Sequence, residues 1–335
     1  MKKALLGMSL LVAMLVFLPV RSFGAMPTSA TLATHAVGGL YHALGTGIGK
    51  VISRYTPTTV RVQPFAGPPA WLPSMDKGET DMGILTSADA ITSYKGIVIY
   101  KRPLTGTRIL ISGGRIHIGF YVRADSDIKT GSELRGKRVP TDLPAMPIAR
   151  LSSTATLAAS GLTYNDIVKV PVSDLTAAGN AFLEGRLDAG WDAVGSPRLT
   201  EANSRIRGGV RFIPVDSSPE GAKRMAQIYP GSYPGLVARG SSTGVATDMH
   251  MLTNDIYLVA TKFMSDEVAY EIVKTLWERN EELGPVHPGL KEWTRERMVN
   301  QTVFIPYHPG AIKFLKEKGV WSKEMDALQA KLLGD

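Results

Sequence analysis

The hydrophobic positions of this chain follow two spacings, one typical of β-strands and the other of helices. Thr31–Val37 is a short strand-like run, and it passes through Gly38-Gly39 into a segment with apolar residues every three or four positions. Those apolar residues are Leu40, Leu44, Ile48, Val51, Ile52 and Tyr55. A repeat of this length places them on one face of a helix. The pattern predicts a strand, a glycine-containing turn and a helix.

The alternation of strands and helices continues along the chain. A strand is expected over 59–65, a short helix over 69–77 and another strand over 81–85. Further strand-like segments lie at 116–122, 136–139, 167–172, 187–194, 212–215, 244–246 and 256–260, and helix-like segments at 147–159, at 176–185 and from 265 onward. Strands that alternate with helices build a mostly parallel sheet covered by helices. We therefore predict an α/β fold.

Two turn-rich stretches divide this pattern. They are 112–115, with two adjacent glycines, and 229–235, with two Pro-Gly pairs. Sheet-like segments lie outside both, so we expect one lobe to be inserted into the other through a hinge that the chain crosses twice. The predicted lobe I is formed by 25–115 and 232–335, and the predicted lobe II by 116–231. This arrangement leaves a cleft between the lobes.

The N-terminus has the pattern of a secretory signal peptide. Lys2 and Lys3 precede an apolar run over 4–18, and small residues follow it. We predict a signal peptide over 1–24, cleaved near Gly24 or Ala25, and therefore a periplasmic protein. A single membrane anchor is the alternative, but the run is shorter than the roughly 20 residues that span a bilayer. No later apolar stretch reaches that length, so the cleaved chain is not expected to span a membrane.

Composition narrows the function classes. The 335 residues are 44% hydrophobic and 20% charged, which excludes a disordered chain and predicts a large core. There is no cysteine, so disulfides, thiolate metal sites and a cysteine nucleophile are excluded. The formal charge of +8 comes from scattered Lys and Arg, so no nucleic-acid partner is expected. The six histidines lack metalloprotease spacing, and we expect neither a metal nor a cofactor.

Two motifs carry candidate chemistry. The turn at Gly38-Gly39 exposes the N–H groups of a helix start, which attract anions, and Tyr41 and His42 follow it. The alternative is a plain strand–helix turn with Tyr41 packed on the sheet. Gly240–Gly244 matches G-x-S-x-G and makes an exported serine hydrolase using Ser242 the alternative function. The segment after it reads as strand or loop, however, whereas a nucleophile elbow must be followed by a helix.

The order of several motifs resembles the TAXI family of TRAP-transporter solute receptors. These motifs are Gly38–Tyr41, Gly78–Gly83, Leu134–Val139, Gly185–Ala189, Tyr233–Gly235 and Tyr307–Ile312. The resemblance covers essentially the whole chain after the N-terminal segment. It implies a two-lobe, type II-like periplasmic binding protein that closes on a small organic acid or amino-acid-like solute. It also implies delivery to a TRAP-type permease driven by an ion gradient; a sensing receptor without transport remains the alternative.

The same resemblance implies the ligand contacts. They are Gly38, Gly39, Tyr41, His42, Phe65, Ala66, Gly67, Thr86, Ser87, Asp89, Asp142, Ala145, Met146, Trp191 and Asp192. For Trp191 the alternative is a packing residue between the lobes. This chain departs from the family at Pro68-Pro69 and at Asp142–Pro147, where donor-rich loops are usual. These departures favour a ligand with an apolar portion or an amine.

Overall fold

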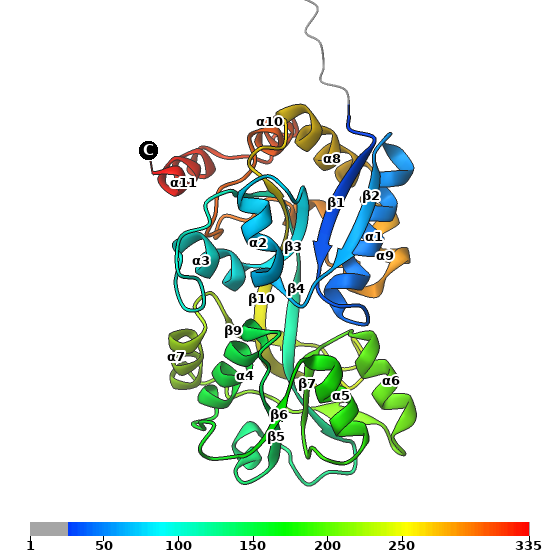
Figure 1. The fold of residues 1–335 in the computed structure, drawn as a ribbon, viewed down its shortest axis with the longest axis vertical. Coiled ribbons are helices and arrows are strands. Elements are labelled where there is room, and N and C mark those ends of the chain that lie inside the picture. The colour runs from blue at the N-terminus through cyan, green and yellow to red at the C-terminus, as the bar shows by residue number, and fades with distance from the viewer. Residues whose placement is uncertain (1–25, 335) are drawn as a thin grey trace, which may run out of the picture.

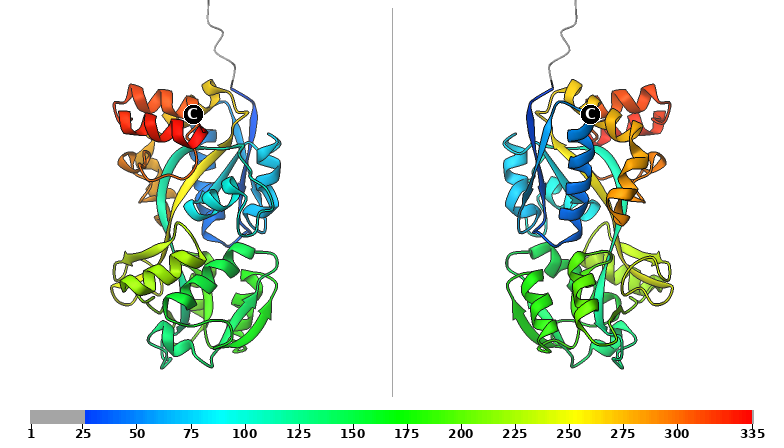
Figure 2. Two further views of the ribbon diagram at one scale, coloured as in Figure 1. Left: turned by 90° about the vertical axis from the view of Figure 1, so that its left-hand side faces the viewer. Right: turned by 90° about the vertical axis from the view of Figure 1, so that its right-hand side faces the viewer.

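The computed structural model describes residues 26–334 (Figure 1). The predicted signal peptide and its cleavage site lie outside the described residues. The elements form two lobes stacked along the long axis of the molecule, as both side views in Figure 2 show. Within the described part of the chain, no helix is long and apolar enough to cross a membrane.

The first lobe is built on parallel strands. β1 (Ser29–Thr34) lies between β2 (Thr59–Pro64) and β3 (Met82–Thr86), and it pairs with both in parallel. The connecting helices are α1 (Leu40–Tyr55) and α2 (Pro68–Asp76), and α3 (Ser87–Lys95) follows β3. The C-terminal helices α8 (Asp266–Glu278), α9 (Leu283–Val286), α10 (Pro309–Glu317) and α11 (Lys323–Leu333) belong to the same lobe. Its core includes Leu32, Ile48, Ile84, Ile272 and Phe314.

Two long antiparallel strands, β4 (Thr107–Arg123) and β10 (Met249–Thr261), run from one lobe into the other. β10 pairs with β3 in the first lobe, and β9 (Tyr233–Val237) pairs with its other end. β4 pairs with β7 (Gly190–Ala193) and β8 (Val210–Phe212) in the second lobe. The main sheet is therefore mixed, with parallel pairs in the first lobe and antiparallel pairs around the long strands.

The second lobe adds a separate parallel pair, β5 (Arg138–Asp142) and β6 (Val168–Val172). Its helices are α4 (Pro147–Ala159), α5 (Leu175–Leu183), α6 (Pro197–Arg205) and α7 (Pro219–Ile228). Val237, Val245 and Met251 pack in the core of this lobe, although they follow residue 232. This packing fits a chain that returns to the first lobe within β10 better than one that returns at residue 232. The lobe boundaries stay a prediction.

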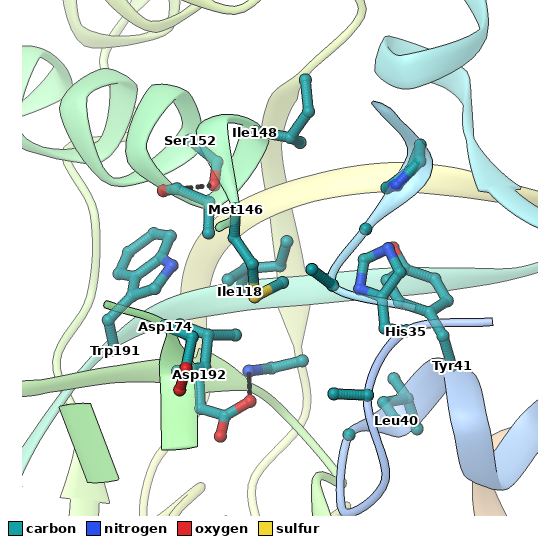
Figure 3. A pocket seen from close by; sticks show the side chains of 18 of the residues that line it. His35, Leu40, Tyr41, Ile118, Met146, Ile148, Ser152, Asp174, Trp191 and Asp192 are labelled. Carbon is teal, nitrogen blue, oxygen red and sulfur yellow. Dashed lines mark hydrogen bonds between the residues drawn. The ribbon is translucent and has the colours of Figure 1, made fainter. Parts of the chain in front are cut away.

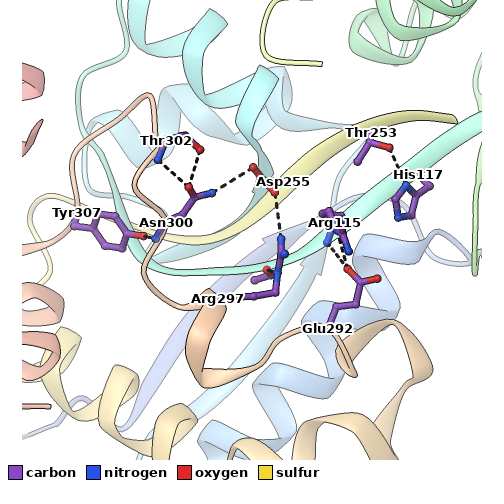
Figure 4. A network of polar contacts seen from close by, with 10 residues as sticks. Arg115, His117, Thr253, Asp255, Glu292, Arg297, Asn300, Thr302 and Tyr307 are labelled. Carbon is purple, nitrogen blue, oxygen red and sulfur yellow. Dashed lines mark hydrogen bonds and ion pairs between the residues drawn. The ribbon is translucent and has the colours of Figure 1, made fainter. Parts of the chain in front are cut away.

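Polar contacts fasten the C-terminal segment to the long strands where they pass between the cores (Figure 4). Arg297 donates to an Asp255 carboxylate oxygen at 3.2 Å and to the Gly113 carbonyl at 2.9 Å. Asn300 donates its side-chain N–H to the other Asp255 oxygen at 3.2 Å. Asp255 lies at a register shift of β10 against β4. The segment therefore braces the strand pair that any hinge motion must bend.

The predicted strand at 244–246 is wrong. These residues lie in the loop between β9 and β10, and Gly244 has a φ of +81°, in the left-handed region. That conformation suits glycine because it has no Cβ, and it is incompatible with an extended strand.

Substituting Gly190 with alanine is expected to destabilise the second lobe by about 1–3 kcal/mol, the usual range for overpacking a core. An added Cβ would lie 2.2 Å from Cζ of the buried Tyr121, its partner across β4 and β7. Urea unfolding measures the effect. The matched control is Gly179→Ala in α5, where a Cβ meets no heavy atom within 4 Å. Alanine favours a helix there by up to about 1 kcal/mol. Equal stability of the two variants would contradict the packing.

Candidate ligand-binding site

A cavity of about 320 Å³ lies between the two lobes and is lined from both. His35, Tyr41 and Asp89 contribute from the first lobe, and Met146 and Trp191 from the second. Figure 3 shows His35 and Tyr41 on one side of this space, and Met146, Ser152 and Trp191 across from them. Ile116 and Ile118 of β4 also line it, so the cavity lies beside one of the strands that join the lobes.

Helix starts converge on this cavity. Residues at or next to the first turns of α1 to α6 line it, because strand-to-helix connections of both lobes open toward the same space. Helix N-termini carry partial positive charge. α2, α4 and α6 begin with proline, however, which has no N–H to donate. A ligand therefore has only a few polar groups of the cavity wall with which it can form hydrogen bonds.

Asp89 is the first of these groups. It is 1% exposed and lies in the first turn of α3. The Thr86 hydroxyl donates to its Oδ2 at 2.6 Å, and its own N–H donates to Thr86 Oγ1 at 2.9 Å. Oδ1 is buried and has no hydrogen-bond partner among residues 26–334. Burial raises the pKa of the Asp89 carboxyl to about 7, against the opposing effect of the Thr86 bonds.

Tyr41 and His35 form an aromatic wall next to Asp89. Their rings meet edge to face, with centroids 4.2 Å apart. The Tyr41 hydroxyl is buried and also lacks a partner in the described structure. Burial, with the nearby Arg198 charge, lowers the pKa of His35 to about 3, so this imidazole is neutral at physiological pH. Burial and the Asp89 charge raise the pKa of Tyr41, so its phenol stays protonated.

An ion pair lies on the second-lobe side of the cavity. Arg198 donates Nε–H to Asp192 Oδ2 at 2.9 Å and Nη2–H to Oδ1 at 3.1 Å. The Arg198 side chain also lies against the turn of the first lobe, since a Cβ on Gly39 would be 3.4 Å from Nη1. Ser196 donates to the Gly38 carbonyl at 3.3 Å and to Asp192 at 3.2 Å. These contacts hold the two lobes together at the cavity.

The remaining wall is mostly apolar. Leu40, Ile118, Met146 and Ile148 line it, together with the Trp191 ring, which packs on Phe120 with centroids 4.7 Å apart. A largely apolar cavity with a few convergent polar groups is the usual form of a small-molecule site.

The sequence pattern of the NMT1-like family matches residues 32–319, which are most of the chain. The chain belongs to the NMT1-like family.

Solved structures resemble this NMT1-like chain in fold. One described as a periplasmic transporter has 13% sequence identity and a TM-score of 0.52, covering 92% of this chain and 98% of that one. A TctC solute binding protein from Polaromonas has 14% identity and a TM-score of 0.45, covering 91% and 94%. The alkanesulfonate-binding protein SsuA from Xanthomonas axonopodis pv. citri, bound to MOPS, has 16% identity and a TM-score of 0.43, covering 90% and 96%.

The likeness to the first structure confirms the predicted α/β fold with two lobes of the periplasmic binding protein type. Membership of the TAXI family stays a prediction.

The cavity brings together most of the residues predicted to bind the ligand. Those that line it are Gly39, Tyr41, Ala66, Gly67, Thr86, Asp89, Ala145, Met146, Trp191 and Asp192. Those that do not line it are Gly38, His42, Phe65, Ser87 and Asp142. His42 instead contacts Thr34 Oγ1 through Nδ1 at 3.1 Å, and Asp142 is exposed with a φ of +71°. Ligand contact by any of these residues stays a prediction.

Several lining residues were missed in the sequence. His35, Ser152, Asp174, Arg198 and Tyr229 line the cavity without belonging to a recognised motif. His35 lies just before the Gly38-Gly39 turn, and its closeness to that motif was the available signal. Tyr229 follows α7 and begins the turn-rich stretch 229–235, but that pattern predicted a turn between the lobes and not a cavity residue.

Ser242 lies away from this cavity. Ser242 lies in the loop between β9 and β10, and it lines a separate groove together with His287. No helix follows Ser242 before β10 begins. The strand–turn–helix geometry of a nucleophile elbow is therefore missing at Ser242. In the described part of the chain, no group of three or more His, Asp or Glu side chains is placed to hold a metal ion.

Proposed function

We propose that this protein is a periplasmic solute-binding receptor, not an enzyme, which closes its two lobes around a small organic solute. The observation that carries this proposal is the cavity itself, about 320 Å³ in volume, lined from both lobes and largely apolar with buried polar groups lacking partners. Such a space suits the retention of a small molecule, because its wall is largely apolar with a few convergent polar groups. Membership of the NMT1-like family and the two-lobe fold support the same proposal.

The solute is a small organic acid or an amino-acid-like molecule. The first turn of α1 suits a carboxylate, because it has no side-chain cap on its N–H groups and Arg198 lies beside it. The free oxygen of Asp89 and the Tyr41 hydroxyl are further polar groups of residues that line the cavity. The apolar wall contacts the body of the solute. Micromolar affinity requires roughly −8 kcal/mol, a magnitude that a few such contacts and apolar burial supply.

Closure follows from the two-strand connection. Bending β4 and β10 would separate the lobes and break the contacts of Ser196 and Arg198 with the Gly38-Gly39 turn. A ligand that touches both walls stabilises the closed state by its differential affinity for it. A membrane partner would then recognise the protein in this closed state.

The membrane partner is a TRAP-type permease driven by an ion gradient. The resemblance of the motif order to the TAXI family supports this partner, and a receptor that only senses its ligand is the alternative. A permease encoded next to this protein, and solute uptake that requires both, would separate transport from sensing.

Native mass spectrometry of the freshly purified protein tests the receptor proposal. We expect a co-purified small molecule that is released unchanged on denaturation. Small-angle scattering is expected to show a smaller radius of gyration when that molecule is added back. A fluorophosphonate probe is expected to leave Ser242 unlabelled. Turnover of an ester, or identical scattering with and without every solute that binds, would contradict the proposal.

A further inference from the structure

We propose that the solute carries a primary amine, and that the Asp89 carboxylate, which lines the cavity together with Tyr41 and Tyr229, receives its ammonium group. This inference rests on the proposed function and narrows the class of solute. It identifies Asp89 as the residue that decides specificity.

The first step is the unsatisfied oxygen. Thr86 Oγ1 accepts the Asp89 N–H, so its own proton donates to Asp89 Oδ2. Oδ1 is therefore the carboxylate oxygen that remains free to accept a hydrogen bond, and no donor among residues 26–334 bonds to it. A buried carboxylate oxygen without a donor is costly, and native proteins rarely leave one. Because Asp89 also lines the cavity, the missing donor is supplied by the ligand.

The second step is charge. The described ion pairs do not include Asp89, and Arg198, the base that lines the cavity, is held by both oxygens of Asp192. A buried carboxylate is stabilised by an opposite charge with good hydrogen-bond geometry. A ligand with an ammonium group brings both a charge and N–H donors to Oδ1. A neutral alcohol brings only a donor.

The third step is the surrounding aromatic groups. Tyr41 comes from α1, Tyr100 from the segment after α3, and Tyr229 from the end of α7. Burial, and to a smaller extent the Asp89 charge, raises the pKa of each. The hydroxyls of Tyr41 and Tyr100 are buried and have no partner among the described residues. Hydroxyl oxygens accept from an ammonium, and tyrosine ring faces attract cations. Together with the negative charge of Asp89, these hydroxyl oxygens suit a cation better than an anion.

The pH dependence follows with a definite sign. An ammonium binds ionised Asp89, so its affinity is full above the Asp89 pKa of about 7 and falls as the pH drops below it. The facing tyrosines have raised pKa values, and the His35 pKa of about 3 lies too low to interfere. Asp174, Asp192 and Arg198 complete the charged groups at the cavity; Asp174 caps α5 and the other two form the ion pair. A ligand that accepts a hydrogen bond from neutral, protonated Asp89 gives the opposite slope.

Isothermal titration calorimetry with 2-phenylethylamine and 3-methylbutylamine tests the inference. The matched probes are 2-phenylethanol and 3-phenylpropanoate, and the pH runs from about 5.5 to about 8, where Asp89 titrates. We expect at least one amine to bind more tightly than either matched probe. Its affinity should fall about tenfold per unit of pH below 7. Asp89→Asn should weaken the amine at least about tenfold, because it removes the charge but keeps the shape.

Asp127→Asn is the control, since Asp127 is exposed and does not line the cavity. It should leave binding unchanged. The pH profile of the unmodified protein tests the inference even if Asp89→Asn does not fold. Tighter binding of 3-phenylpropanoate with affinity rising at low pH, no binding of either amine, or equal affinities of the two variants would overturn it. Any of these results, alongside a co-purified acid or neutral solute, would leave the receptor proposal standing.

Discussion

Replacing Trp191 with alanine is expected to lower the free energy of unfolding by about 3–5 kcal/mol, the usual cost of deleting a large buried aromatic side chain. Trp191 is 2% exposed and packs with Phe120, Val139 and Leu157 in the core of the second lobe. The same ring lines the ligand cavity, so its removal also takes away part of the wall. Urea unfolding followed by circular dichroism measures the stability, and titration with the co-purified solute measures the affinity.

Trp191→Phe separates the two effects. Phenylalanine keeps an aromatic ring against Phe120, so we expect a stability loss of less than about half that of the alanine variant. The affinity should still fall, because the smaller ring leaves part of the cavity wall empty. An alanine variant as stable as the unmodified protein would show that Trp191 is not a core residue.

Arg198→Ala is expected to destabilise the protein by about 3 kcal/mol, because it leaves a buried carboxylate without its cation. Asp192 is 4% exposed, and after the substitution it keeps only the Ala193 N–H and the Ser196 hydroxyl as donors. The variant also loses the side chain that lies against Gly39 of the opposite lobe. We therefore expect a lower unfolding midpoint in urea and, by small-angle scattering, a larger radius of gyration with ligand bound.

Two further variants identify the cause of this loss. Arg205→Ala removes an arginine from the same helix, but its partner Glu201 is exposed, so the cost should stay below about 1 kcal/mol. Adding Asp192→Asn to Arg198→Ala removes the unpaired charge and should recover part of the stability. If Arg205→Ala costs as much as Arg198→Ala, burial of the ion pair is not the reason.

The hydrophobic pattern predicted the first lobe well because its elements are local. The helix over 40–55 buries residues spaced three or four positions apart, such as Leu40, Leu44 and Ile48, so this spacing shows in the sequence. The long strands were predicted only in part, over 116–122 and 256–260. Gly113 and Gly114 were interpreted as part of a turn-rich stretch, but they lie inside β4, where the Trp293 ring packs at the positions that their Cβ atoms would take. A contact with a residue far along the chain leaves no local signal.

The cavity shows the same division. Motif order pointed to Tyr41, Asp89 and Trp191, which the structure brings to one space. It also pointed to Asp142, but the backbone there turns through positive φ at Asp142 and Leu143, burying Leu143 and exposing the acid. His35 and Arg198 are near those motifs in the sequence. They come from opposite lobes, and the Arg198 charge acts on His35 only because the lobes meet at the cavity.

Hydrophobic periodicity and turn residues act over a few positions, so they were enough to predict the α/β class, the two-lobe plan and the helix starts that form the candidate site. The extent of β4 and β10, and the set of side chains that share the cavity, became known from the folded structure alone. The same structure shows that Asp89 keeps a buried oxygen without a partner while Arg198 is paired with Asp192. Burial and charge pairing depend on segments that meet in space from distant parts of the chain, and no local pattern of residues records them.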